Sequence, residues 1–199
     1  IQFYCSSNQE IFDTVIQAFK LGENSDVALP VMISYNAFIL SHTSMPAEIP
    51  NQKEIDDYLG RYKSLWKVDP KNPITFGNII MPEHYEKIRR AMQDAHENAK
   101  KLIPKITKEW ENKFGRFNGD LIEKYKCEDA ETILLAMGAI AAESKVAIDF
   151  LRREGYKIGL ARIRTFRPFP NEEIVKLTKN ADLIVIDRNI SCGNEGALF

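Results

Sequence analysis

The chain has 199 residues, of which 44% are hydrophobic and 28% are charged, and this composition excludes a disordered or fibrous protein. Its 27 Lys and Arg residues are balanced by 28 Asp and Glu residues, which leaves a net charge of -1. We therefore expect no nucleic-acid partner, because proteins that neutralise phosphates carry a basic excess or a basic block.

The three cysteines, Cys5, Cys127 and Cys192, are far apart in the sequence and form no CxxC motif. They supply too few ligands for a zinc or iron–sulfur site, so we predict no metal site in this chain. No apolar run approaches the roughly 20 residues of a membrane span, and no signal peptide is visible. We expect a cytoplasmic protein without a membrane partner.

A strand is predicted to end within residues 1–5, and a helical stripe of apolar residues follows it as far as Gly22. Ser7 or Asn8 is expected to cap this helix by accepting hydrogen bonds from its first free amides. Residues 26–36 have the apolar, β-forming composition of a buried strand. The order strand, helix, strand predicts a βαβ unit and a parallel sheet.

The sequence changes character between Met45 and Pro82, where five prolines leave only residues 52–59 with a helical pattern. This composition predicts a linker. A long amphipathic helix is expected over residues 83–114, with Pro82 in its first turn and Gly115 at its end. We interpret this helix as a structural arm.

The α/β pattern returns after residue 120. Strands are predicted at residues 132–137, 157–165 and 182–187, with helices between them at residues 141–153 and 171–180. This order predicts a second, βαβαβ unit with a parallel sheet. The chain begins without Met inside a predicted strand and stops just past the third strand of this unit, so we expect it to be part of a longer polypeptide.

The tripeptide Ser41-His42-Thr43 follows a predicted strand, and ligands of open α/β sheets gather where strands end. It is a weak catalytic group, because adjacent residues do not normally face each other and no acidic partner can be assigned to His42. The alternative interpretation is a hydrogen-bonded turn at the exit of the strand.

A second set of polar candidates consists of arginines. Arg162 and Arg164 alternate along one predicted strand face, and Arg167 follows them. Their guanidinium groups have two possible roles: they hold a carboxylate or phosphate, or they form ion pairs, either internal or across a subunit interface. Arg188 and Asn194, in the loop after the last strand, are candidates for the same contacts, because the glycines around Asn194 allow an anion nest.

Several stretches resemble the alpha subunit of pyruvate:ferredoxin oxidoreductase and of related 2-oxoacid:ferredoxin oxidoreductases. They are IQFYCSSNQEIFDTVIQAFKLGE, SYNAFILSHTSMPAEIP, YKSLWKVDPKNPITFGNIIMPEHY, RIRTFRPFPNEEI and DRNISCGNEGALF, in the same order along the whole chain. The resemblance implies that residues 1–45 are the tail of a thiamine-diphosphate-binding domain. Residues 46–119 would be the proline-rich linker and the long helical arm, and residues 120–199 a truncated, parallel α/β domain like the transketolase C-terminal domain.

The resemblance also implies a reaction. A small 2-oxoacid, pyruvate first, is oxidatively decarboxylated to acetyl-CoA and CO2 on thiamine diphosphate with Mg²⁺, and [4Fe-4S] clusters carry the electrons to ferredoxin. Coenzyme A is the cosubstrate, and beta, gamma and delta-type subunits complete the complex. These groups are bound mainly by other subunits or by segments absent from this chain, so no catalytic residue is assignable here. Only Ser41, His42 and Thr43 match a family segment near the pocket, which implies a place behind the residues that touch the substrate.

The run Tyr35-Asn36-Ala37 stands where a pyruvate enzyme is expected to have an Asp-Gly type of turn. A branched-chain 2-oxoacid or oxalate is therefore an alternative substrate, and oxalate would need no coenzyme A. A non-catalytic scaffold related to transketolase is the alternative from a different class, because no catalytic group is assignable within residues 1–199.

Overall fold

The computed structural model describes residues 1–190, 192–193 and 195–198, and it begins with a parallel βαβ unit. Strand β1 (Gln2–Tyr4) leads into helix α1 (Asn8–Gly22), and strand β2 (Met32–Ser34) pairs in parallel with β1. Of the two predicted caps, Ser7 is the one that accepts the amide of Glu10, at 3.1 Å.

Strand β2 is much shorter than the predicted strand at residues 26–36. The amides of Val27 and Ala28 donate to the carbonyl of Asn24, which makes the start of this run a turn. Pro30 has no N–H group for a sheet ladder. The regular pairing therefore begins only at Met32.

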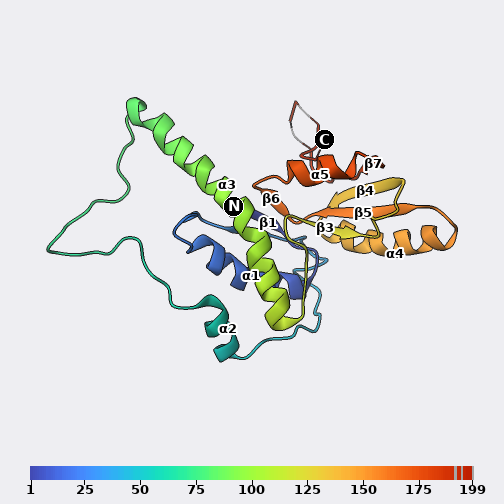
Figure 1. Cartoon of the computed structure of the whole chain (residues 1–199), viewed down its shortest axis with the longest axis horizontal. Coiled ribbons are helices and arrows are strands. Elements are labelled where there is room, and N and C mark those ends of the chain that lie inside the picture. Colours follow the sequence, from blue (N-terminus) through green and yellow to red (C-terminus); the bar gives the residue numbers. More distant parts are fainter. Residues whose placement is uncertain (191, 194, 199) are drawn as a thin grey trace.

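Helix α2 (Gln52–Leu59) is present where the sequence predicts it, with a capping box formed by Asn51 and Glu54. The chain then runs without regular structure to helix α3 (Pro82–Phe114), and Figure 1 shows this connection looping away from the rest of the molecule. The start of α3, residues 82–90, is exposed and projects beyond the sheets.

The second half of α3 is not a free arm. One hydrophobic cluster joins it to α1 and α2, and its buried members include Ile16, Tyr58, Ile103, Ile106 and Trp110. Side chains on both sides of residue 45 therefore share a core. The domain boundaries at residues 45 and 119 stay a prediction.

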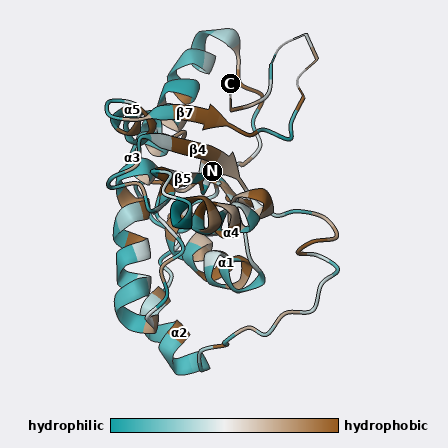
Figure 2. Cartoon of the chain, turned by 90° about the vertical axis from the view of Figure 1, so that its right-hand side faces the viewer, coloured by the Kyte–Doolittle hydropathy of each residue, from teal (hydrophilic) through white to brown (hydrophobic). Residues whose placement is uncertain are grey.

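The C-terminal part holds the remaining elements. They are β3 (Ile122–Tyr125), β4 (Thr132–Met137), α4 (Ala139–Arg153), β5 (Ile158–Ile163), β6 (Thr165–Arg167), α5 (Asn171–Leu177) and β7 (Asp182–Val185). A four-stranded sheet has the order β3-β5-β4-β7, in which β4 is parallel to both β5 and β7. Figure 2 shows β4 and β7 as mainly hydrophobic, whereas α3 is mainly hydrophilic. The predicted α/β class is confirmed.

Two features correct the prediction of a purely parallel second unit. Strand β3, absent from the prediction, pairs antiparallel with β5 at the sheet edge. The predicted strand at residues 157–165 is two strands, because β6 leaves the four-stranded sheet and pairs antiparallel with β1. This second pairing gives the three-stranded sheet its order β2-β1-β6. Among the described residues, no helix combines the length and the apolar composition needed to cross a membrane.

A buried ion network joins the two sheets. The carboxylate of Glu10 on α1 lies 3.0 Å from Arg162 Nη2 and 3.1 Å from Arg164 Nε. All three side chains are at most 1% exposed. Arg164 Nη2 also donates to Thr14 and Gln17, each at 3.0 Å.

The outer side of the network reaches strand β3. Arg162 Nε lies 2.6 Å from Glu123 Oε2, and Lys145 lies 2.5 Å from the other oxygen of that carboxylate. Burial opposes the charge of Arg162, but the carboxylates of Glu10 and Glu123 outweigh it and raise the pKa of this guanidinium. Burial likewise opposes ionisation of Glu123, but Arg162 and Lys145 lower its pKa. Both shifts favour the charged forms of Arg162 and Glu123.

We predict that Glu10→Gln lowers the free energy of unfolding by about 3–5 kcal/mol, because it leaves two buried guanidinium groups without their shared carboxylate. Urea denaturation of the purified protein measures this change. The control is Glu23→Gln at the exposed end of the same helix, which we expect to change stability by less than about 0.5 kcal/mol. Equal stability of the two variants would contradict a central role for Glu10.

Candidate functional site

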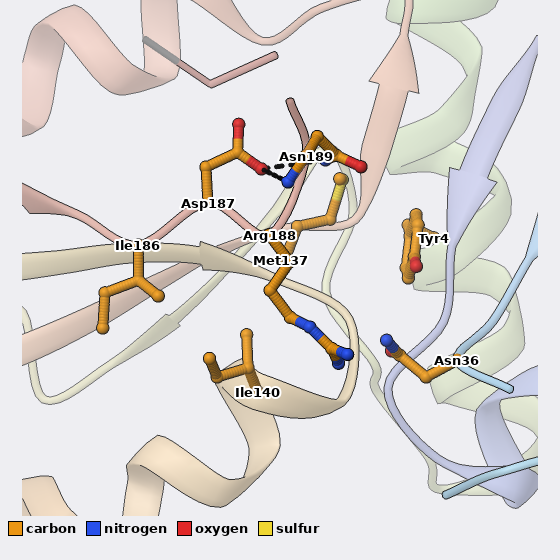
Figure 3. Close-up of a pocket in the computed structure, with 8 residues that line it drawn as sticks. All are labelled: Tyr4, Asn36, Met137, Ile140, Ile186, Asp187, Arg188 and Asn189. Carbon is orange, nitrogen blue, oxygen red and sulfur yellow. Dashed lines mark hydrogen bonds between the residues drawn. The ribbon is translucent and has the colours of Figure 1, made fainter. Parts of the chain in front are cut away.

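The carboxyl ends of two pairs of parallel strands face each other, β1 with β2 from one sheet and β4 with β7 from the other. Tyr4 is the last residue of β1, Asn36 follows β2, Met137 is the last residue of β4, and Ile186 follows β7. They surround a cavity of about 210 Å³ (Figure 3), whose other lining residues are Ile140, Asp187, Arg188 and Asn189.

The cavity also lies at a reversal of strand order. The chain leaves β4 through α4 towards β5, and it later returns through α5 to β7 on the opposite side of β4. The crevice at such a topological switch point, outside the carboxyl ends of the strands, is where ligands bind in open α/β sheets. We therefore take this cavity as the candidate functional site.

Asn36 connects the two sheets at this cavity. Its Oδ1 accepts a hydrogen bond of 2.8 Å from the amide of Ala139, the first residue of α4. The helix has Gly138 at its cap position, which offers no side chain for this purpose. An asparagine in the loop after β2 thus caps α4, the helix that follows β4.

Gly138 is required here for two reasons. Its φ of +71° is one that L-residues rarely adopt. A Cβ at this position would lie 2.5 Å from Asn36 Oδ1 and 2.5 Å from a ring carbon of Tyr4. The close approach of the two sheets at the cavity therefore depends on the missing side chain.

Asp187 and Arg188 bring opposite charges to the cavity, but they point in different directions. The amide and side chain of Asn189 donate to Asp187 Oδ1 at 2.9 and 2.8 Å, and the amide of Leu198 donates to Oδ2 at 2.7 Å. Burial opposes ionisation of Asp187, but these hydrogen bonds lower its pKa. Figure 3 shows the guanidinium of Arg188 directed away from this carboxylate, towards Asn36 and Ile140. No ion pair among the described residues includes Arg188.

Ser41, His42 and Thr43 lie on an exposed turn after β2 and do not line the cavity. Contrary to the expectation for adjacent residues, Ser41 Oγ is 2.7 Å from His42 Nδ1. Ser41 Oγ also accepts the amide of Phe38, and the His42 ring stacks on the Phe38 ring with centroids 4.8 Å apart. These are the contacts of a hydrogen-bonded turn. A place behind the residues that touch the substrate stays a prediction.

The predicted arginines fall in three different environments. Arg162 and Arg164 form the internal ion pairs that the sequence left open as one of their roles. Arg167 is exposed and lies over the ring of Phe166, 5.0 Å from its centroid. Arg188 alone among them lines the cavity. Asn194 lies outside the described residues.

Sequence reasoning missed Tyr4, Asn36 and Asp187 as cavity residues. Each stands at or just after the carboxyl end of a parallel strand. This position could have identified them, because ligands of open α/β sheets bind at these strand ends. The pairing of β1 with β6, which brings the two sets of strand ends together, has no local sequence pattern.

The described residues do not fit the implied metal-containing cofactors. The Cys5 thiol is buried, and burial raises its pKa to about 12. Cys127 is partly buried and Cys192 is exposed. No group of three or more His, Cys, Asp or Glu side chains in the described part of the chain is placed to hold a metal ion. We therefore derive no chemical step through Mg²⁺-diphosphate or an iron–sulfur cluster.

Comparison with known families identifies the chain. The family model described as "Pyruvate flavodoxin/ferredoxin oxidoreductase, thiamine diP-bdg" matches residues 1–108, which is more than half of it. The chain belongs to this family. A second model, "Pyruvate:ferredoxin oxidoreductase core domain II", matches residues 130–199. The resemblance read from the sequence is confirmed.

Individual relatives of the chain agree with this assignment. It is 44% identical over its whole length to pyruvate synthase subunit PorA of Pyrococcus furiosus, and 41% identical to ketoisovalerate oxidoreductase subunit VorA of Pyrococcus horikoshii. In each case it covers 50% of the relative, so the chain spans about half the length of these oxidoreductase subunits.

A solved structure shares the fold. It is the 2-oxoglutarate:ferredoxin oxidoreductase from Magnetococcus marinus, which matches with a TM-score of 0.59 and 11% identity. The match covers 96% of this chain and 35% of that one. At this level of identity the likeness shows the fold alone.

We predict that Gly138→Ala lowers the free energy of unfolding by about 1–3 kcal/mol more than Gly155→Ala, because its new methyl group meets Asn36 and Tyr4. Gly155 is the matched control, since it also has a positive φ, but a Cβ there would meet no atom within 4 Å. Thermal denaturation of both variants measures the difference. Equal destabilisation would mean that the contact at the cavity does not limit the packing of the two sheets.

Proposed function

We propose that this chain is part of the alpha subunit of a cytoplasmic, thiamine-diphosphate-dependent 2-oxoacid:ferredoxin oxidoreductase. The reaction is the oxidative decarboxylation of pyruvate with coenzyme A, which yields acetyl-CoA and CO2, and ferredoxin accepts the electrons. The observation that carries the proposal is the 44% identity, over the whole of this chain, to a pyruvate synthase subunit.

The side chains of this chain indicate which cofactors it would bind and which would be bound elsewhere in the protein. We assign the diphosphate with its Mg²⁺ ion and the [4Fe-4S] clusters to other subunits or to other segments of the protein. The three cysteines support this assignment, because they lie in different parts of the fold and Cys5 is a buried, protonated thiol. This chain contributes the rigid junction of two sheets and a surface for its partners.

The connection between α2 and α3 supports association with another subunit. Its large apolar side chains are exposed, with Val68 and Ile79 each 91% exposed and Trp66 and Phe76 more than half exposed. Exposed apolar surface of this extent marks interaction sites. Residues 61–81 also carry four basic side chains and one acidic side chain, in a protein whose net charge is -1. A beta, gamma or delta-type subunit with an apolar groove and an acidic rim would complement this segment.

One other substrate has an observation in its favour. The 41% identity to a ketoisovalerate oxidoreductase subunit is close to the identity to pyruvate synthase subunits, so a branched-chain 2-oxoacid is the second candidate. The two acids differ only in their alkyl groups. A hydrophobic pocket discriminates between such substrates by about 1–3 kcal/mol. The rates of the reaction with the two acids therefore identify the preferred substrate.

We predict that the natively purified complex reduces a viologen dye when both pyruvate and coenzyme A are present. The rate should be at least about tenfold lower with 2-oxoisovalerate, because a pocket shaped for a methyl group excludes the larger isopropyl group. Each 2-oxoacid, and oxalate, is tested with and without coenzyme A, and complex without any acid is the control. Faster reduction with 2-oxoisovalerate would make the branched-chain 2-oxoacid, and not pyruvate, the preferred substrate. No reduction with any acid, from a preparation with intact clusters, would favour a non-catalytic scaffold.

We predict that Trp66→Ser weakens assembly of the complex by about tenfold or more, because large aromatic side chains dominate the energetics of interfaces. Sedimentation of the reconstituted subunits measures assembly, and thermal denaturation checks that the subunit itself stays folded. Tyr156→Ser removes another exposed aromatic side chain, next to α4, and should leave assembly unchanged. An unchanged assembly constant for Trp66→Ser would exclude this segment from the interface.

A further inference from the structure

We propose that the cavity at the ends of β1, β2, β4 and β7 binds a small oxyanion, a carboxylate or phosphate group, with Arg188 as its cationic contact. Neither the matched family descriptions nor the proposed reaction assigns a ligand to this place. The size of the cavity limits the ligand. At about 210 Å³ it is smaller than the 300–1,000 Å³ pockets of drug-sized ligands, so it suits a small acid or a single phosphate group.

Two neutral groups that line the cavity can donate hydrogen bonds into it. Asn36 has its Oδ1 engaged by the amide of Ala139, and this bond fixes the side-chain amide so that Nδ2 remains as a donor at the cavity. The hydroxyl of Tyr4 lies beside it on the same wall (Figure 3). Among the described residues, neither Nδ2 of Asn36 nor the Tyr4 hydroxyl has another hydrogen-bond partner within the cavity. Two neutral donors are thus available to a ligand in the cavity.

Arg188 supplies the charge. Its guanidinium points to the same side of the cavity as Asn36 and forms no ion pair within the described part of the chain. A planar guanidinium binds carboxylate and phosphate oxygens through two parallel hydrogen bonds, which makes it suited to both groups.

The nearby carboxylate of Asp187 keeps its negative charge but forms no ion pair with Arg188 in the described part of the chain (Figure 3). Both oxygens of Asp187 already accept hydrogen bonds, from Asn189 and from the amide of Leu198, and Figure 3 shows the carboxylate directed away from Arg188. Met137, Ile140 and Ile186 add apolar side chains to the lining, and Asn189 adds a further polar one. Arg188 is itself exposed, so its preference for an anion rests on its charge and its planar, two-pronged geometry. The cavity therefore favours a negative ligand.

Two sources supply this chemistry: a small carboxylic acid, or a phosphate group, free or carried by a larger molecule. Acetate and inorganic phosphate serve as separate probes because neither is turned over by a 2-oxoacid oxidoreductase. Binding is measured without any turnover, so failure of the proposed reaction would leave the result unaffected.

The experiment is calorimetric titration of the natively purified complex with inorganic phosphate and, separately, with acetate. We expect saturable binding of at least one probe, and Arg188→Met should weaken it by about tenfold or more, the range for a hydrogen bond to a charged group. Arg188→Lys should retain part of the affinity. Arg153→Met, which removes an exposed arginine at the far end of α4, is the matched control and should bind like the unmodified complex.

A second variant keeps the test valid if Arg188→Met fails to assemble into the complex. Tyr4→Phe removes one donor hydroxyl and keeps the ring that packs beside Gly138, and it should weaken binding about threefold. The proposal is overturned if neither probe binds saturably to the unmodified complex. It is also overturned if Arg188→Met and Tyr4→Phe both bind with unchanged affinity, because the anion would then lie elsewhere.

Discussion

The buried carboxylate of Glu10 is the interaction on which the arrangement of this molecule depends. It lies on the helix of the first βαβ unit and accepts hydrogen bonds from Arg162 and Arg164, at the place where the chain passes from the four-stranded sheet to the three-stranded sheet. Burying three charges is costly, and it is tolerated only when their hydrogen bonds are satisfied, as the contacts to Thr14 and Gln17 help to ensure here. The network thereby fixes one sheet against the other.

The cavity is a consequence of this junction. Because β6 continues from β5 and pairs with β1, the carboxyl ends of β1 and β2 come to face those of β4 and β7. Asn36 can then cap α4, and Gly138 allows the backbone to approach Tyr4. A cavity formed in this way belongs to neither sheet alone, and its shape depends on the junction that the ion network stabilises.

The outer surface of the molecule has the opposite character. At the interior junction, the buried charged side chains pair with one another. Residues 61–81 and the start of α3, in contrast, expose apolar side chains that no described residue covers. Both features suit the role that we propose, that of one subunit in a larger oxidoreductase. The junction holds the two sheets together, and the exposed segment offers apolar surface to a partner.

The sequence by itself determined the family, the α/β class and helices α1, α2 and α3, because linear motifs, caps such as Ser7 and apolar periodicity are local signals. It did not determine the antiparallel strands β3 and β6, whose short, charged or interrupted patterns gain their structure from pairing. It also left the roles of Arg162 and Arg164 open. Their partner Glu10 is 152 residues from Arg162 along the chain, and only tertiary folding brings such groups, and the lining of the cavity, into contact.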